Sequence, residues 1–118
     1  MQKYLGIDYG DKRVGLALAM ENSIALPYKV LLNKNLEQLF QDLELIIQQE
    51  NISLIVVGLP HSLSGNLNQR LAITQQFVDM LRVKIAVPIA TVNLEYPDAS
   101  EASMATPGEL VHAPPTGR

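Results

Sequence analysis

Residues 3–17 read KYLGIDYGDKRVGLA, and this stretch decides the fold. Apolar side chains alternate with other residues over 3–9, which is the period of a β-strand. The pair Gly10-Asp11 supplies the residue types that tight turns prefer. The alternation resumes over 13–20. The stretch therefore predicts two antiparallel strands joined by a short turn.

Asp8 is the ionisable residue at the end of the first predicted strand, where the apolar pattern stops. In open α/β sheets, binding and catalytic sites lie at the carboxyl ends of strands. A carboxylate at such an end is suited to a metal ion or to phosphate chemistry. The alternative is a structural one, in which Asp8 accepts a hydrogen bond from an amide of the turn.

The composition indicates one globular domain. The chain has 118 residues, of which 47% are hydrophobic, enough for a buried core. No apolar run approaches the roughly 18 residues of a membrane span, and the N-terminus does not read as a signal peptide. The absence of cysteine excludes disulfides and thiolate zinc sites. These features suit a cytoplasmic protein that does not contact membranes.

The formal net charge is −3. Proteins that bind nucleic acid tightly and without specificity usually carry a positive balance, because neutralised phosphates supply much of their affinity. The sign argues against that class of binder. It does not argue against a nuclease, whose carboxylates are partly offset by bound metal ions.

The middle of the chain predicts a third strand followed by a helix. Residues 24–31 read as a strand, and Pro27 places it at an edge of the sheet because proline cannot donate to a ladder. Apolar residues recur at helical spacing over 36–50. Asn35 is a suitable N-cap and Asn51 a suitable left-handed C-cap for this helix.

The remainder predicts strand, helix and strand. Residues 52–58 form an apolar run typical of a buried parallel strand. A loop over 59–66 precedes a helix over about 67–83, and residues 89–93 form the last strand. The order predicts an α/β fold whose mixed five-stranded sheet has three antiparallel strands and then two parallel ones.

The domain is expected to span residues 1–104. Residues 105–118 contain three prolines and two glycines, a composition that is incompatible with a helix over most of their length. We interpret them as a disordered or irregular tail.

Two blocks carry a resemblance to a known family. The first is GIDYG at 6–10 followed by KRVG at 12–15, and the second is VVGLP at 56–60 followed by Gly65 and Arg70. Together they make the chain similar to the YqgF family of ribonuclease H-like nucleases, which are described as Holliday-junction resolvases or pre-16S rRNA nucleases. The resemblance covers residues 1 to about 95. It implies a ribonuclease H-like fold.

The resemblance also implies a catalytic metal site. Asp8 and Glu95 would be the carboxylates that hold Mg²⁺ or Mn²⁺, and the metal would activate a water and stabilise the leaving oxygen. The family has a segment like DERLTTxEA where this chain reads LEYPDASEA, from residue 94 to residue 102, so Glu95 is kept while its neighbours differ. An exposed loop glutamate is the structural alternative for Glu95, and Asp98 reads as the cap of a short helix.

A third acidic residue of the family, in a segment like DKLAA, has no counterpart in this sequence. Positioning of the metal and substrate is most of what such catalysis consists of. The sequence therefore predicts weakened activity.

Three further residues are candidate substrate contacts. Arg13 and Arg70 match arginine positions of the family, and arginine suits bidentate contact with phosphate. His61 lies in the predicted loop beside the site and can assist proton transfer. The structural alternative is an exposed residue of the hairpin turn for Arg13 and a solvated surface side chain for His61.

The expected partner is nucleic acid, either structured pre-rRNA in the maturation of the 16S 5′ end or branched DNA in recombination and repair. A resolvase is expected to be a homodimer, whereas a maturation nuclease can be a monomer. A second hypothesis is a catalytically impaired remnant of the fold that binds nucleic acid or a protein. The Gly-Ile-Asp-x-Gly pattern also opens actin-like ATPase domains, but this chain is too short for their second domain.

Overall fold

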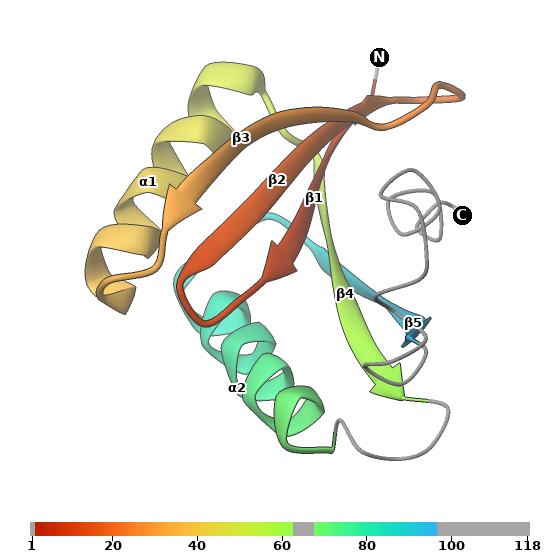
Figure 1. The fold of residues 1–118 in the computed structure, drawn as a ribbon. Coiled ribbons are helices and arrows are strands. Elements are labelled where there is room, and N and C mark those ends of the chain that lie inside the picture. Colours follow the sequence, from red (N-terminus) through yellow and green to blue (C-terminus); the bar gives the residue numbers. More distant parts are fainter. Residues whose placement is uncertain (1, 63–67, 97–118) are drawn as a thin grey trace.

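The computed structural model describes residues 2–62 and 68–96 (Figure 1). The predicted tail at 105–118, the predicted cap Asp98 and the motif glycine Gly65 lie outside the described residues. Among the described helices, none is long and apolar enough to cross a membrane. The elements in chain order are β1 (Lys3–Tyr9), β2 (Arg13–Met20), β3 (Leu26–Leu32), α1 (Leu36–Glu50), β4 (Leu54–Ser62), α2 (Asn68–Lys84) and β5 (Ile89–Tyr96).

The five strands form one sheet in the order β3-β2-β1-β4-β5. β2 pairs antiparallel with β1 and β3, while β4 pairs parallel with β1 and β5. This confirms the predicted mixed sheet with three antiparallel strands followed by two parallel ones. β3 lies at the edge, as Pro27 indicated, although the strand begins and ends slightly later than predicted. Its register against β2 shifts between Leu16 and Ala17.

The first helix has the predicted bounds and caps. Asn35 has an extended backbone, and its side-chain oxygen accepts a hydrogen bond from the Gln38 amide at 2.8 Å. Asn51 ends the helix in the left-handed conformation, with φ 53° and ψ 50°. The Gln38 side chain donates to Asp42 at 2.9 Å instead of reaching back to the cap. Local signals therefore fix both ends of α1.

Both helices cover the same face of the sheet (Figure 1). The buried core joins their apolar faces to alternate residues of the three strands β1, β2 and β4, as expected for a two-layer α/β fold. Its sheet residues are Leu5, Ile7, Val14, Leu16, Ile55, Val57 and Leu59, and its helix residues are Leu39, Phe40, Leu43, Ile46, Phe77, Val78 and Leu81.

An aromatic stack ties the end of β1 to both helices. The ring of Phe77, in α2, lies 3.9 Å from that of Tyr9 and 6.0 Å from that of Phe40, measured between centroids. Both pairs are close to parallel, with interplanar angles of 11° and 4°. Because Tyr9 directly follows Asp8, this packing fixes the backbone at the carboxyl end of β1.

The opposite face of the sheet carries no helix within the described residues. Side chains alternate along a strand, so the residues between the core positions face this side. Around the centre they are small: Gly6 and Asp8 on β1 pair with Ala17 and Gly15 on β2, and Gly58 lies on β4. Asp8 is therefore exposed on this face and flanked by residues with little or no side chain.

The parallel strands β4 and β5 run further than predicted. We expected a loop from residue 59, but β4 continues to Ser62 and pairs with β5 as far as Tyr96. β1 pairs with β4 only up to Ile7 and Val57. Beyond that point β4 has one ladder partner among the described strands, and Pro60 is tolerated because one side of the strand needs no donor.

Gly10→Ala is expected to destabilise the fold by about 1–3 kcal/mol. A Cβ at Gly10 would lie 2.5 Å from the backbone oxygen of Arg13, to which the Gly10 amide donates at 3.0 Å. Gly6→Ala is the matched control on the same hairpin, because its Cβ would meet Ala17 at an ordinary 3.8 Å. Urea unfolding measures both. Equal effects of the two changes would contradict the steric argument.

Candidate metal and phosphate site

Asp8 lies at the carboxyl end of the central strand β1 and is exposed. It pairs with Gly15 on β2, and a Cβ at Gly15 would lie 3.8 Å from that of Asp8. On the other side, Asp8 stands level with Gly58 of β4, since the preceding residues Ile7 and Val57 are paired. Glycine on both flanking strands leaves the carboxylate accessible from the open face.

Leu94 closes the region next to Gly58. A Cβ built on Gly58 would collide with the Leu94 side chain, so this side chain lies directly over the glycine. Leu94 is the residue that stands where the resembled family segment begins with aspartate. An apolar side chain therefore occupies this part of the open face in the present chain.

Two opposing effects act on the Asp8 carboxyl. Surrounding protein atoms remove solvent and raise its pKa above the ordinary value of 3.8, and the positive charge of Arg70 partly offsets this by lowering the pKa. Desolvation is the larger effect. A bound cation would relieve the same penalty, because it stabilises the ionised form.

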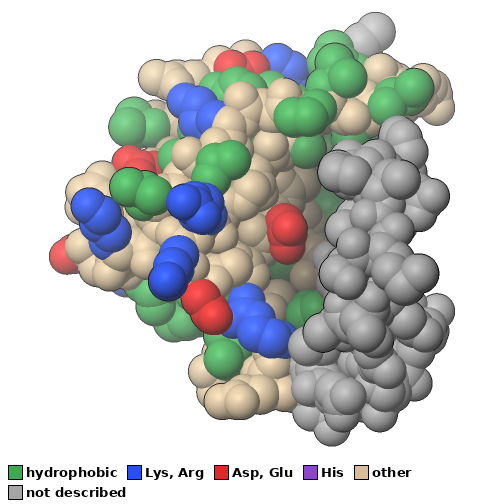
Figure 2. All heavy atoms as spheres, viewed as in Figure 1, with side chains coloured by type: hydrophobic (Ala, Val, Ile, Leu, Met, Phe, Trp, Pro, Cys, Tyr) green, Lys and Arg blue, Asp and Glu red, His purple; other side chains and the backbone are tan. Residues whose placement is uncertain are grey.

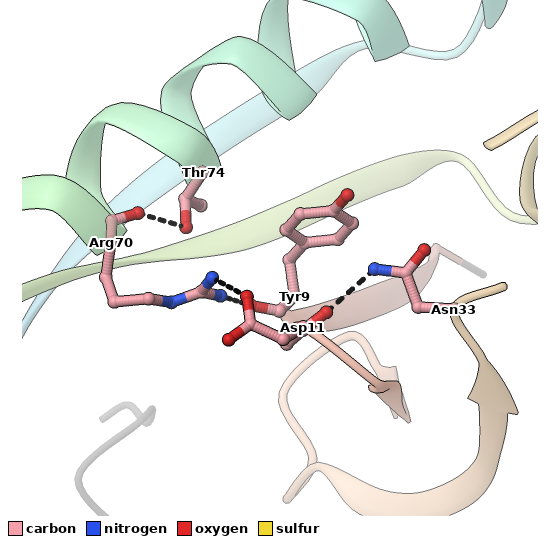
Figure 3. Close-up of polar contacts among 6 residues, drawn as sticks. Tyr9, Asp11, Asn33, Arg70 and Thr74 are labelled. Carbon is pink, nitrogen blue, oxygen red and sulfur yellow. Dashed lines mark hydrogen bonds and ion pairs between the residues drawn. The ribbon is translucent and has the colours of Figure 1, made fainter. Parts of the chain in front are cut away.

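Arg70, whose positive charge acts on Asp8, is fixed by contacts to the β1–β2 turn (Figure 3). Its guanidinium donates to the backbone oxygen of Tyr9 at 2.7 Å and forms an ion pair with Asp11. The Arg70 side chain is 25% exposed, whereas that of Asp11 is 76% exposed. One terminal nitrogen of the guanidinium is thus anchored to the backbone, and the other contacts an exposed carboxylate.

The turn itself is held by other hydrogen bonds. The side chain of Asn33 donates to the backbone oxygen of Gly10 at 2.8 Å (Figure 3). The backbone N–H of Asn33 also donates to the backbone oxygen of Lys12 at 2.8 Å. Asn33, just after β3, therefore binds the turn from the opposite side to Arg70.

The sequence predicted that Glu95 follows the last strand. In the structure it lies within β5. Its backbone pairs with His61, three residues further along the ladder than Gly58. Asp8 and Glu95 are thus at the same end of the sheet, but separated by roughly 10 Å along the strands and by two strand spacings, again roughly 10 Å. The backbone alone does not make them neighbours.

His61 also lies in a strand, where the sequence predicted a loop. Its Nε2 is 3.1 Å from Oδ1 of Asn93 on the paired strand β5. The imidazole is therefore hydrogen-bonded to a neighbouring strand. This contact differs from the solvated surface side chain that the sequence offered as the alternative, and a role of His61 in proton transfer stays a proposal.

Arg13 is exposed at the start of β2, next to the turn. Figure 2 shows Lys and Arg side chains spread over this view of the molecule with Asp and Glu among them. The basic residues seen there do not form one continuous stripe. Contact with nucleic acid on this face would therefore rely on a few phosphates.

Asp8 is the described carboxylate best suited to a divalent cation. Mg²⁺ takes oxygen ligands and keeps several waters, so a single accessible carboxylate fits part of its shell. Within residues 2–62 and 68–96, no cluster of three or more His, Cys, Asp or Glu forms a complete site. The described residues therefore offer one ligand, Asp8, to such an ion.

Asp11 and Asn33 were not singled out by sequence reasoning. Asp11 was read only as a turn residue, and Asn33 lies in the connection between β3 and α1. No local pattern distinguishes them, because their partners lie 59 and 23 positions away in the chain. The arrangement becomes visible only in the folded structure.

Comparison with known proteins identifies relatives of this chain. The RuvX family, described as Holliday junction resolvase, matches residues 2–106. A protein of Desulforudis audaxviator named "Putative pre-16S rRNA nuclease" is 37% identical over 90 residues, covering 75% of this chain and 64% of the relative. A protein of the same name from Maridesulfovibrio salexigens is 37% identical over 112 residues, covering 94% of this chain and 79% of the relative.

Among solved structures, Thermus thermophilus RuvC in complex with a Holliday junction substrate aligns with a TM-score of 0.55. The identity is 14%, and the alignment covers 92% of this chain and 73% of that chain. At this identity the likeness shows the fold alone, which is ribonuclease H-like. Because the family match spans most of the sequence and two relatives exceed one third identity, the chain belongs to the RuvX family, the same family that the sequence motifs indicated under the name YqgF.

Proposed function

We propose that this protein is a divalent-metal-dependent nuclease that cleaves phosphodiester bonds in pre-16S rRNA during ribosome biogenesis. The alignment spans 64% of the length of the Desulforudis relative, so the activity of that whole protein is a proposal for this chain. The observation that carries the proposal is the position of Asp8. It is an accessible carboxylate at the carboxyl end of the central strand, with glycines on both sides and an arginine beside it.

Asp8 and Glu95 are the residues that would hold Mg²⁺ or Mn²⁺. The ion would supply an activated water and stabilise the leaving oxygen. The chain's own contribution is to keep Asp8 in place through the Tyr9–Phe77 stack and to keep a positive charge, Arg70, next to it. Arg70 and Arg13 would contact phosphates of the substrate, and His61 would assist proton transfer.

A second candidate is the resolution of Holliday junctions in DNA. The matching family bears that description, and the RuvC complex holds such a junction. Both substrates are recognised largely through shape and backbone, so the described residues favour neither by base contacts. We place RNA first because the two relatives described above carry the name pre-16S rRNA nuclease. An rRNA substrate would also place the protein in the cytoplasm.

The test is cleavage of a labelled pre-16S rRNA fragment and of a labelled four-way DNA junction, each with Mn²⁺. The full chain is compared with Asp8→Asn, Glu95→Gln and the control Glu21→Gln, an exposed carboxylate in the turn at the far end of β2. We expect RNA cleavage that both site changes abolish and the control leaves intact.

Cleavage of the junction alone would assign the DNA function instead. The absence of cleavage of either substrate by a folded protein would support the impaired-remnant hypothesis. Size-exclusion chromatography with light scattering on the same samples would separate a monomer from a homodimer.

A further inference from the structure

We propose that Asp11 is a tethered competitor for the phosphate-binding edge of Arg70. In the free protein its carboxylate occupies the position that a substrate phosphate takes when nucleic acid binds. This inference rests on the proposed function, because it concerns how the same site admits its substrate. It adds a residue that neither the motif nor the comparisons assign.

Arg70 makes its two contacts to the turn through two different nitrogens of the guanidinium (Figure 3). One nitrogen of the guanidinium donates to the Tyr9 backbone oxygen at 2.7 Å, which orients the group beside Asp8. A different nitrogen donates to Asp11. Each guanidinium nitrogen donates hydrogen bonds to carboxylate and phosphate oxygens alike. Asp11 therefore holds the same kind of contact that a phosphodiester would make.

The Asp11 side chain is not needed to hold the β1–β2 turn in place. The turn is held by the Gly10 amide on the Arg13 oxygen and by two hydrogen bonds from Asn33. The Tyr9 ring is held by its stack on Phe77. These contacts remain if the Asp11 carboxylate moves away, so the ion pair is not needed to position the turn.

The Asp11 carboxylate is easily displaced from Arg70. The Asp11 side chain is 76% exposed, so it returns to water readily when another anion takes its place. An ion pair whose carboxylate is this exposed contributes little, because solvent screens it. A strand that brings a phosphate next to Asp8 would thus exchange one anion for another at Arg70, while the Tyr9 anchor stays in place.

The experiment measures binding without cleavage. A fluorescein-labelled pre-16S rRNA fragment is titrated with the 118-residue protein in EDTA, and dissociation constants are taken from fluorescence anisotropy. Asp11→Asn is expected to bind about twofold to fivefold more tightly than wild type. Asp11→Glu, which keeps the carboxylate, is expected to bind within about twofold of wild type.

The double variant Asp11→Asn/Arg70→Gln tests the mechanism. We expect it to bind no more tightly than Arg70→Gln alone, because the gain requires the freed guanidinium. Arg70→Gln is also expected to reduce the slope of log affinity against log salt by about 0.7–0.9, the loss of one phosphate contact. The matched control Glu21→Gln removes the same charge at the other end of β2, and we expect no more than a marginal change from it.

Three results would overturn the inference. They are a gain in Asp11→Asn that Glu21→Gln reproduces, a gain that persists without Arg70, and unchanged or absent RNA binding in Asp11→Asn. The nuclease proposal fails separately. If the coupling is present and Mn²⁺ produces no cleavage, the inference stands without it. If cleavage occurs without the coupling, only the role of Asp11 is wrong.

Discussion

Asp8→Asn is expected to abolish saturable Mn²⁺ binding and to lower metal-dependent cleavage by at least about 100-fold. An amide has the shape of the carboxylate but no charge, and the ion supplies several kcal/mol of transition-state stabilisation, each 1.36 kcal/mol of which is a factor of ten. Calorimetric titration with Mn²⁺ and single-turnover cleavage measure the two effects. Binding and cleavage at wild-type levels would exclude Asp8 as a metal ligand.

The same substitution is expected to make the metal-free protein more stable at neutral pH. Desolvation raises the pKa of Asp8 in the folded state, against the opposing charge of Arg70. A raised carboxyl pKa means that the folded state favours the protonated form, so its contribution to stability is greatest below the ordinary value of 3.8 and is lost as the pH rises through the folded pKa. At neutral pH the ionised group therefore destabilises the fold, and asparagine removes that penalty.

The pH dependence of the melting temperature gives the measurement and its control. The gain from Asp8→Asn should be present at about pH 7 and shrink toward about pH 3. Glu50→Gln should behave in the opposite way, because a hydrogen bond from Lys3, at 3.0 Å, lowers the pKa of Glu50. The stability from Glu50 is present above its ordinary pKa of 4.5 and lost on acidification. Matching pH trends for the two variants would contradict the assigned signs.

Phe77→Ala is expected to lower the free energy of unfolding by about 3–5 kcal/mol. The side chain is fully buried and stacks on both Tyr9 and Phe40, so its removal leaves a cavity between β1 and the two helices. Since small domains are stable by only about 5–15 kcal/mol, this is a large share of the total. Urea unfolding followed by circular dichroism measures it.

Val83→Ala is the matched control for Phe77→Ala. Val83 is on the same helix but is 85% exposed, so its truncation should change stability by no more than about 0.5 kcal/mol. A loss of less than about 1 kcal/mol in Phe77→Ala would mean that the site collapses around the missing ring. In that case the stack would not be what fixes the carboxyl end of β1.

The parts of the fold that follow local rules were predicted well. Apolar periodicity and the two asparagine caps specify α1 within its own residues, and the alternation around Gly10-Asp11 specifies the β1–β2 hairpin. The edge position of β3 follows from Pro27 alone. In each case the information lies within one element, so a single sequence contains it.

The ends of β4 and β5 were predicted less well because they depend on pairing between distant residues. Gly58 and Pro60 are residue types typical of loops, and they dominated the local pattern. In the structure, each strand extends because the other lies beside it. The Leu94 side chain fills the space that a Cβ at Gly58 would take. Tertiary contact outweighed local propensity at this point.

The candidate site divides in the same way. Asp8 was predicted because strand ends at the edge of an apolar run are places for chemistry. The contact of Arg70 with Asp11 was not, because it joins residues 59 positions apart and either residue alone resembles an ordinary surface charge. The sequence therefore suggests Asp8 as the centre of the candidate site but not the groups that surround it.

The length mismatch between β1 and its neighbour has a dynamic consequence. Past Gly58, the β4–β5 pair is a two-stranded ribbon among the described strands, and such ribbons are marginally stable alone. Its amide protons should exchange with solvent through local opening, at a lower free energy than those of the β1–β4 ladder. Asp8 would then belong to the rigid β1–β4 part of the sheet, whereas Glu95 would belong to the ribbon, which opens by itself. The distance between Asp8 and Glu95 would therefore change without unfolding of the core.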